Sequence, residues 1–220
     1  YAVFDWAMMI SFTAVNLFGN SISQAAFPIL SRQRNNFTEF KATFLTSFNQ
    51  ILYLTLPFSV LFIVLRIPVV RLVLGGDKLD WATTVLTGQT LAWLAVSLFA
   101  QALLQLILRA FYALHDTKTP LFAGGATTIL MCTMSAVSVF LLNQGVQSIA
   151  ISYSISNILF FVILLYILHK RIGGFLNPAG IYSMTKIFTA AFFTAFALYI
   201  PIKLLDRLVF DTTRTVNLLI

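Results

Sequence analysis

Charged residues and cysteine are both scarce in this sequence. Asp, Glu, Lys and Arg together make up 10% of the 220 residues, whereas a soluble domain carries roughly a quarter. Hydrophobic residues make up 59%, and the mean hydropathy is +0.90. The single cysteine, Cys132, lies within an apolar run, which excludes a disulfide framework and a thiolate metal site. We therefore expect lipid, and not water, to surround most of the chain.

Residues for catalysis and metal binding are equally sparse. The two histidines, His115 and His169, lie at the ends of apolar runs. His115 precedes Asp116, but neighbouring side chains on a helix point about 100° apart, so no pair of His and carboxylate is implied. The sequence contains no metal-ligand spacing, phosphate-binding glycine loop or nucleophile elbow. We predict a protein that is not an enzyme and that needs no metal or other cofactor.

Long stretches without charge predict an all-α fold, a polytopic bundle of transmembrane helices. Each stretch is long enough for the about 20 residues of helix that cross a bilayer. The longest one contains Asn143, Gln144 and Gly145, a turn signal that divides it into two helices. We expect about six spanning helices in a single membrane domain over residues 1–220, at residues 4–30, 44–66, 82–112, 120–142, 147–169 and 182–204.

The basic residues fall in pairs and triplets between these stretches. This distribution is typical of membrane-flanking anchors and, despite the net charge of +7, does not form the single basic face of a nucleic-acid-binding protein. Short connections make successive helices antiparallel, so two sets of connections lie on opposite sides of the bilayer. One set holds slightly more cations and is therefore slightly favoured as cytoplasmic. The cations in this set of connections are Arg32, Arg34, Lys41, Arg109, Lys118, Lys170, Arg171 and Lys186.

Two polar stripes follow helical spacing inside the predicted spans. Asn16, Asn20 and Gln24 recur every four residues in the first span, with Ser23 beside them. The third span carries a similar stripe, which consists of Gln89, Trp93, Ser97, Gln101, Gln105 and Arg109. Unpaired amides in hydrocarbon are costly, so both stripes need polar partners. They either form interhelical hydrogen bonds, worth about 0.6 kcal/mol each on average, or line a water-filled cavity.

Two segments carry a family resemblance. The residues from Arg109 to Pro120 read RAFYALHDTKTP, and the first span ends in QAAFPILSR at Gln24 to Arg32. Both resemble the MurJ (MviN) family of lipid II flippases, which belongs to the multidrug/oligosaccharidyl-lipid/polysaccharide exporter superfamily. The family fold has about fourteen helices in two related lobes, and this chain resembles the eighth to the thirteenth. The resemblance implies the C-terminal lobe of a longer transporter, without its N-terminal lobe.

The resemblance also implies a function, a substrate and a location. The expected function is the flipping of lipid II, an undecaprenyl-pyrophosphate-linked disaccharide peptide, across the bacterial cytoplasmic (inner) membrane by alternating access. Connections bearing Arg32 and Lys118 would face the cytoplasm. The implied partners are lipid II, membrane lipids and the missing N-terminal lobe, with no nucleic acid. Where several family members place an arginine, this sequence reads Ala7, Met8, Met9 and Ile10, so head-group cations would come largely from the missing lobe.

The candidate site residues form two groups. The substrate cavity would be lined by Asn16, Asn20, Ser23 and Gln24. The cytoplasmic gate, in the loop with the family signature, would consist of Arg109, Asp116, Lys118, Thr119 and Pro120. A loop ordered only by local caps and a surface ion pair, worth about 0 to 1 kcal/mol, would explain the same gate residues. Two other functions stay open: a flippase or exporter for another polyprenyl-linked glycan or a drug, and a non-transporting membrane scaffold of the cell-wall machinery.

Overall fold

The computed structural model of the chain describes residues 2–75, 80–141, 145–174, 185–191, 193–197 and 200. Within these residues all regular structure is helical, so the predicted all-α fold class is confirmed. The elements in chain order are α1 (Ala2–Ala14), the π-helix η1 (Val15–Asn20), α2 (Ser21–Arg32), α3 (Phe37–Val64), α4 (Arg66–Leu74), α5 (Trp81–Val96), α6 (Leu98–Ala113), α7 (Lys118–Ala136), the π-helix η2 (Val137–Leu141) and α8 (Val146–Arg171).

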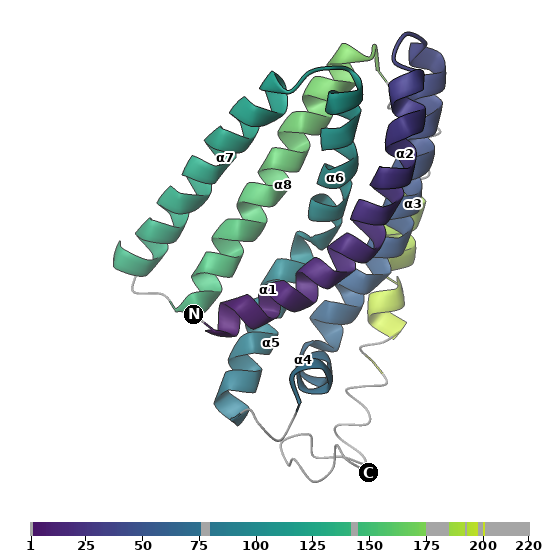
Figure 1. The fold of residues 1–220 in the computed structure, drawn as a ribbon. Helices are drawn as coiled ribbons and strands as arrows, with labels where there is room; N and C mark the ends of the chain where they lie inside the picture. The colour runs from purple at the N-terminus through teal and green to yellow at the C-terminus, as the bar shows by residue number, and fades with distance from the viewer. Residues whose placement is uncertain are drawn as a thin grey trace.

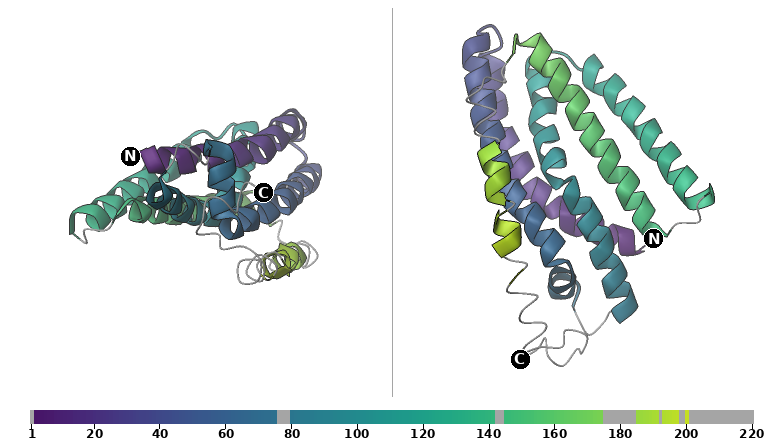
Figure 2. Two further views of the ribbon diagram at one scale, coloured as in Figure 1. Left: turned by 90° about the horizontal axis from the view of Figure 1, so that it is seen from below. Right: turned by 180° about the vertical axis from the view of Figure 1, so that it is seen from behind.

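The long helices run alongside one another in an elongated bundle (Figure 1). α6 packs against α2, α3 and α8, while α1 packs against α5 and α7 against α8. The α2–α3 connection, the α6–α7 connection and the end of α8 lie at the same end of the bundle (Figures 1 and 2). The buried core includes large side chains from α3 and α6, such as Phe40, Phe44, Leu103 and Phe111.

Four helical segments are long and apolar enough to cross a membrane: Ala2–Arg32, Phe37–Val64, Lys118–Phe140 and Val146–Arg171. The pair of α5 and α6 makes a fifth if the two helices count as one span. These five segments overlap the first five predicted spans. The sixth prediction, residues 182–204, lies partly outside the described residues, where a shorter apolar helix falls within Thr185–Ala197.

The predicted third span, residues 82–112, consists of two helices, α5 and α6, and not of one continuous helix. α5 and α6 meet at Ser97 with a bend of 45°. Such a break frees backbone carbonyls at the end of α5, and in lipid no water satisfies them. Three serine hydroxyls, from α3, from α8 and from the break itself, do so instead. Ser154 Oγ donates to Trp93 O at 2.7 Å, Ser97 Oγ to Leu94 O at 3.0 Å and Ser59 Oγ to Ala95 O at 2.5 Å.

The polar stripe on α5 and α6 largely forms hydrogen bonds within and between helices. Gln147 of α8 donates to Gln89 Oε1 at 2.5 Å. Gln101 donates to Ser97 Oγ at 2.9 Å and accepts a bond from Tyr153 OH at 3.5 Å. The sequence analysis left two interpretations of this stripe, hydrogen bonds between helices or the lining of a water-filled cavity. For Gln89, Ser97 and Gln101 the structure supports the hydrogen bonds.

The first span contains a π-helical turn, η1, that brings two backbones unusually close. A Cβ atom on Gly19 would lie 2.7 Å from Ala102 Cα of α6. Glycine permits this approach because it has no side chain to collide with the facing helix. The contact holds η1 against α6 in the middle of the bundle.

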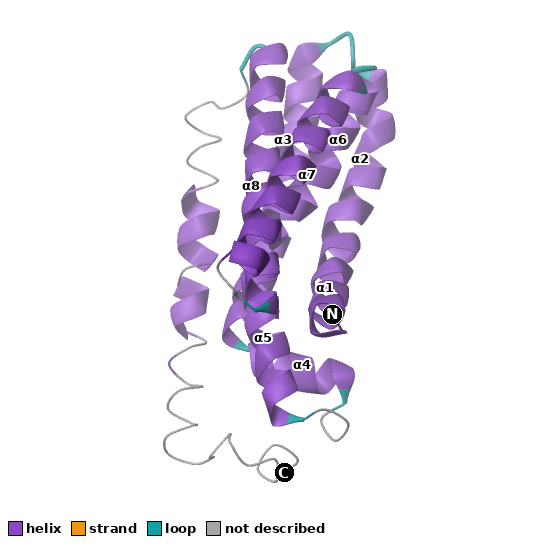
Figure 3. Ribbon diagram, turned by 90° about the vertical axis from the view of Figure 1, so that its left-hand side faces the viewer, coloured by secondary structure: helices purple, strands orange, loops and turns teal. Residues whose placement is uncertain are grey.

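The short helix α4 falls where the sequence analysis expects only a connection. It lies across the bundle and not along it (Figure 3). Arg71 stacks over the Trp81 ring, with 4.7 Å between the guanidinium carbon and the ring centroid, which ties α4 to the start of α5. Arg66, Pro68 and Arg71 interrupt the apolar pattern here, so sequence hydropathy alone does not reveal the helix.

Gly19→Ala is expected to destabilise the protein, because the added methyl group overlaps the Ala102 backbone. Overpacking of this kind costs about 1–3 kcal/mol. Gly125→Ala is the matched control, since a Cβ there meets no atom within 4 Å and alanine favours a helix by up to about 1 kcal/mol. Thermal unfolding of the purified protein in detergent should show a lower midpoint for Gly19→Ala alone. Equal midpoints for the two variants would contradict the close approach of η1 and α6.

Candidate functional site

Arg109, which the sequence analysis assigns to the gate, contacts Asn20, which it assigns to the cavity. Arg109 Nη2 donates to Asn20 Oδ1 at 2.5 Å, and Nη1 donates to the Asn20 main-chain carbonyl at 3.4 Å. Gln24 Nε2 donates to the same Oδ1 at 3.3 Å. The guanidinium therefore fixes the orientation of the Asn20 amide and joins the first span to α6.

The π-helical turn leaves carbonyls that side chains then bond. A π-turn shifts the register of the backbone hydrogen bonds and is frequent at functional sites. Ser21 Oγ donates to Asn16 O at 3.4 Å, and Ser23 Oγ donates to Gly19 O at 2.5 Å. Together with the bond from Arg109 to Asn20 O, these contacts satisfy the backbone around η1 without water.

The four cavity residues differ in their exposure. Asn16 and Gln24 are exposed and Asn20 is half-buried. Ser23 is 0% exposed and uses its hydroxyl on its own helix, so it packs inside the bundle and lines no open surface. Among the described residues, no side chain forms a hydrogen bond with the Asn16 amide. Asn16 and Gln24 are thus the residues of this group that present amides to the surroundings.

The α6–α7 connection is organised around Asp116. α6 ends in a Schellman turn, in which His115 N–H bonds to Tyr112 O and Asp116 N–H bonds to Phe111 O, both at 3.0 Å. His115 takes the left-handed position of this turn, with a φ of 56°, a conformation that favours glycine. The Asp116 carboxylate then accepts bonds from the Thr119 N–H at 3.0 Å and the Thr119 hydroxyl at 2.7 Å. These two bonds cap the start of α7.

Asp116 also forms an ion pair with Arg171 at the end of α8. The Asp116 side chain is 12% exposed and the Arg171 side chain 42%. Burial raises the pKa of Asp116, but the hydrogen bonds from Thr119 and the hydrogen bond and charge of Arg171 outweigh it, so the pKa lies below its ordinary value. The carboxylate is therefore ionised at neutral pH and connects the start of α7 to the end of α8.

Two further contacts hold the same end of the bundle together. Arg34 Nη1 donates to His115 Nε2, which joins the α2–α3 connection to the α6–α7 connection. Lys41 Nζ donates to Gly173 O at 3.0 Å, which joins α3 to the residues that follow α8. We call these two contacts and the Asp116–Arg171 pair the end network. The α2–α3 and α6–α7 connections thus share one end, as the sequence analysis expects of the proposed cytoplasmic side.

Lys118 and Pro120 lie beside the end network. Lys118 is exposed and Pro120 is buried, and both line a pocket of about 380 Å³ together with Leu108 and Tyr112. Pro120 stands in the first turn of α7, where its missing N–H leaves no helical hydrogen bond unmade. Lys118 is accordingly the cation of the signature loop that remains open to a ligand or to water.

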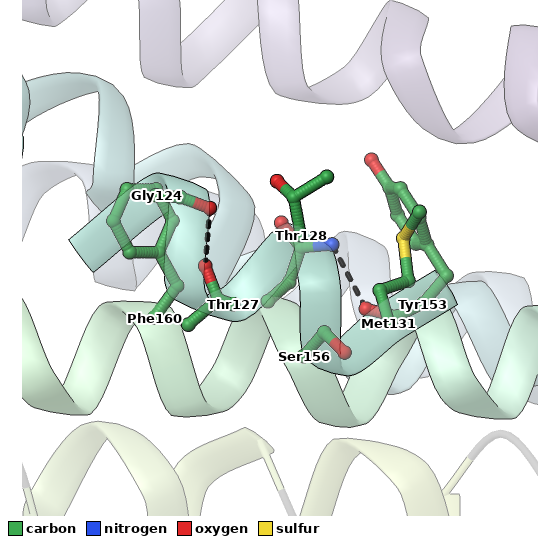
Figure 4. Close-up of a pocket in the computed structure, with 8 residues that line it drawn as sticks. Gly124, Thr127, Thr128, Met131, Tyr153, Ser156 and Phe160 are labelled. Atoms are coloured by element: carbon green, nitrogen blue, oxygen red, sulfur yellow. Dashed lines mark hydrogen bonds between the residues drawn. The ribbon is translucent and has the colours of Figure 1, made fainter. Parts of the chain in front are cut away.

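A pocket of about 280 Å³ lies between α7 and α8 (Figure 4). Its polar lining is neutral and comes from Thr127, Thr128, Tyr153, Ser156 and Asn157. Among the described residues, none forms a hydrogen bond with the buried Ser156 hydroxyl. At one end, a Cβ on Gly124 would lie 3.4 Å from the Phe160 ring. Small and hydroxylated residues thus let the two helices pack closely while leaving a neutral polar space between them.

The chemistry of these sites is limited to hydrogen bonds and charge. In the part of the chain that the structure describes, no group of three or more His, Cys, Asp or Glu side chains could hold a metal ion. Sequence reasoning missed the end network, because Arg34 and His115 lie 81 residues apart and Asp116 and Arg171 lie 55 apart. The sequence contained one indication of this network. Its basic residues Arg34, Lys41 and Arg171 belong to connections that the sequence analysis predicts on the same side of the membrane.

Comparison with known proteins places this geometry in context. A family model described as "Lipid II flippase MurJ" matches residues 1–215. "Probable lipid II flippase MurJ" of Thermotoga maritima is 28% identical over 150 residues, which cover 68% of this chain and 31% of that protein. The protein of the same description from Rhizobium meliloti is 30% identical over 84 residues, covering 38% of this chain and 16% of that protein.

A solved structure gives the same fold. "Lipid II flippase MurJ, inward closed conformation" superimposes with a TM-score of 0.68 at 20% identity, covering 97% of this chain and 48% of that one. The matched regions thus span about half of the solved structure and a third or less of the curated relatives.

Asp116→Asn is expected to lower stability at neutral pH by about 1 kcal/mol, because the ion pair with Arg171 is lost while an oxygen still caps α7. The depressed pKa means that the carboxylate contributes stability above its unfolded pKa of about 3.9 and loses it as the pH falls through the folded pKa. Unfolding midpoints of wild type and variant should therefore begin to converge as the pH falls below about 4 and should coincide once the pH lies below the folded pKa. A difference in midpoint that persists below the folded pKa would show that charge is not the cause. Asp116→Ala should be less stable by about 1 kcal/mol more, since the cap is also lost.

Proposed function

Because this chain belongs to the lipid II flippase MurJ family and, in the part that the structure describes, has four helices long and apolar enough to cross a membrane, we propose that it forms one lobe of a transporter that flips lipid II. Transport would cross the bacterial cytoplasmic membrane by alternating access. The head group would enter a cavity between this lobe and a second lobe of the same protein, and it would leave on the opposite side. The polyprenyl tail would stay among the membrane lipids.

The observation that carries this proposal is a pair of exposed amides in the middle of a spanning helix. Asn16 and Gln24 are exposed on the first span, and hydrocarbon cannot satisfy their hydrogen-bonding groups. A water-filled cavity that receives a polar head group can do so. Amide side chains supply both donors and acceptors, which suits the hydroxyl and acetamido groups of a disaccharide.

Arg109 would act as a positioning residue beside this cavity. A pyrophosphate in a low-dielectric site needs cations around it, yet the Arg109 guanidinium already donates two bonds to Asn20. Its role in the proposal is to hold the Asn20 amide toward Gln24. The stretch Ala7, Met8, Met9 and Ile10 has no cation, so the charges that bind pyrophosphate would come mainly from the second lobe.

The end network would form the cytoplasmic gate. It joins three segments that are distant in sequence through an ion pair, a contact between a guanidinium and an imidazole, and a bond from Lys41 to a carbonyl. Exposed contacts of this kind are each worth about 0 to 1 kcal/mol, so they can form and break during a transport cycle. Lys118, which lines the adjacent pocket, would attract the anionic head group toward the gate.

Charge reversal tests the gate. Asp116→Arg and Arg171→Asp should each lower lipid II flipping, because like charges then face each other at the closed end. The double variant restores an opposite pair and should recover most of the lost activity. The measurement is complementation of cells depleted of their own lipid II flippase, with membrane abundance followed by immunoblot. Lys170→Glu is the matched control, one residue away and outside the end network. Normal export by both single variants at normal abundance would remove the ion pair from the gate.

Replacement of an exposed amide tests the cavity. Asn16→Leu should lower the flipping of labelled lipid II several-fold in vesicles that contain the full-length protein, while its unfolding midpoint stays unchanged or rises. Phe12→Leu is the control, since Phe12 is also exposed, at 41%, one turn earlier on the same helix. A variant that transports normally would show that Asn16 does not line the route. A lower midpoint for Asn16→Leu would instead identify the amide as a packing contact.

A further inference from the structure

A pocket of about 350 Å³ lies at the end of the bundle opposite the end network. It forms where α3 ends, where α5 passes and where α8 begins, and its polar lining consists of Arg66, Gln89 and Gln147. Figure 1 shows these elements at the end of the bundle away from the α2–α3 and α6–α7 connections. The pocket contains none of the cavity or gate residues described above.

The polar groups of this pocket are only partly used by the protein. Gln147 Nε2 donates to Gln89 Oε1 at 2.5 Å, which leaves the Gln89 amide nitrogen and the Gln147 carbonyl oxygen available. Arg66 is exposed. Among the described residues the Arg66 side chain has no ion-pair or hydrogen-bond partner. The pocket thus offers a guanidinium and an amide N–H as donors, and a carbonyl oxygen as an acceptor.

The rest of the lining is apolar and open to the surroundings of the bundle. Ile63 is 36% exposed, Val96 41% and Trp93 44%. Tryptophan is enriched at membrane interfaces, where its ring meets both lipid and water, and arginine near a helix end extends its guanidinium toward head groups. The pocket therefore combines a polar part with an apolar edge, as a lipid head group with attached acyl chains requires.

We propose that this pocket binds the head group of a glycerophospholipid that carries one net negative charge and a free hydroxyl. Phosphate oxygens only accept hydrogen bonds, which matches the donors Arg66 and Gln89, and a head-group hydroxyl donates to the Gln147 carbonyl. One unpaired guanidinium balances one phosphodiester charge, whereas a pyrophosphate needs more than one cation. The apolar edge favours a lipid over a soluble anion. This inference does not depend on the proposed flippase function.

The test is native mass spectrometry of the purified full-length protein, titrated with phosphatidylglycerol and with phosphatidylcholine of the same acyl chains. Wild type should bind its first phosphatidylglycerol more tightly than phosphatidylcholine, which has no head-group donor. Arg66→Gln should weaken that binding about tenfold, the effect of losing one charge-assisted bond. Arg32→Gln, the same substitution at the other end of the bundle, should leave it unchanged. Gln147→Leu should reduce the ratio of the affinity for phosphatidylglycerol to the affinity for phosphatidylcholine.

Several outcomes would overturn the proposal. Equal affinity of wild type and Arg66→Gln for phosphatidylglycerol, with both proteins folded by thermal unfolding, would exclude Arg66 as the phosphate ligand. Equal binding of the two lipids by wild type would exclude the hydroxyl contact. Displacement of phosphatidylglycerol by an equal concentration of inorganic phosphate would identify a site for a soluble anion. Displacement by undecaprenyl pyrophosphate at lower concentration would assign the pocket to the transport route instead.

Discussion

Hydrocarbon requires every backbone polar group in this bundle to find its partner within the protein, and two irregular parts of the helices, the bend at Ser97 and the π-turn η1, meet that requirement with side-chain donors. At Ser97 the chain bends by 45° and three serine hydroxyls bond the carbonyls that the bend frees. At η1 the hydroxyls of Ser21 and Ser23 and the guanidinium of Arg109 bond three further carbonyls. At both places, hydroxyl or guanidinium donors lie within hydrogen-bonding distance of the affected carbonyls.

The same requirement concentrates polar side chains at particular levels of the bundle. Some donors that satisfy a break come from the same helix, such as Ser21 and Ser23. Others come from neighbouring helices, such as Ser154, Ser59 and Arg109, which therefore lie at facing positions. Around η1, these donors form a local polar environment that holds the half-buried Asn20 amide, beside the exposed amide of Gln24. The close contact of Gly19 with Ala102 brings η1 and α6 near enough for this exchange. The hydrogen bonds between η1 and α6 therefore depend on the close packing at Gly19.

The sequence predicted the helical fold because charge-free stretches of spanning length leave few alternatives in lipid. It also predicted the polar stripes, since helical spacing places Asn16, Asn20 and Gln24 on one face. It did not predict the break at Ser97, where no proline or glycine marks the bend, or α4, where charges interrupt the apolar pattern. Ser23 and Gln24 are neighbours in the sequence and point about 100° apart on the helix, so Ser23 lies off the exposed face and is buried. The Asp116–Arg171 pair depends on tertiary packing between residues 55 positions apart, which spacing along one helix cannot reveal.

The contacts at the two levels of the bundle differ in how readily they exchange partners. At Ser97 no water can replace the serine hydroxyls, so separating these helices would leave carbonyls unsatisfied in lipid. At the end network, water can form hydrogen bonds with each charged or polar group when its protein partner moves away. An exposed ion pair there contributes only about 0 to 1 kcal/mol. A ligand shifts a two-state equilibrium from 1:99 to 99:1 with about 5.5 kcal/mol of differential binding, which exceeds the sum of three such contacts. In the proposed transport cycle, a head group with that differential affinity would open the connections while the serine-bonded break keeps the helices together, and we place the proposed gate in the end network for that reason.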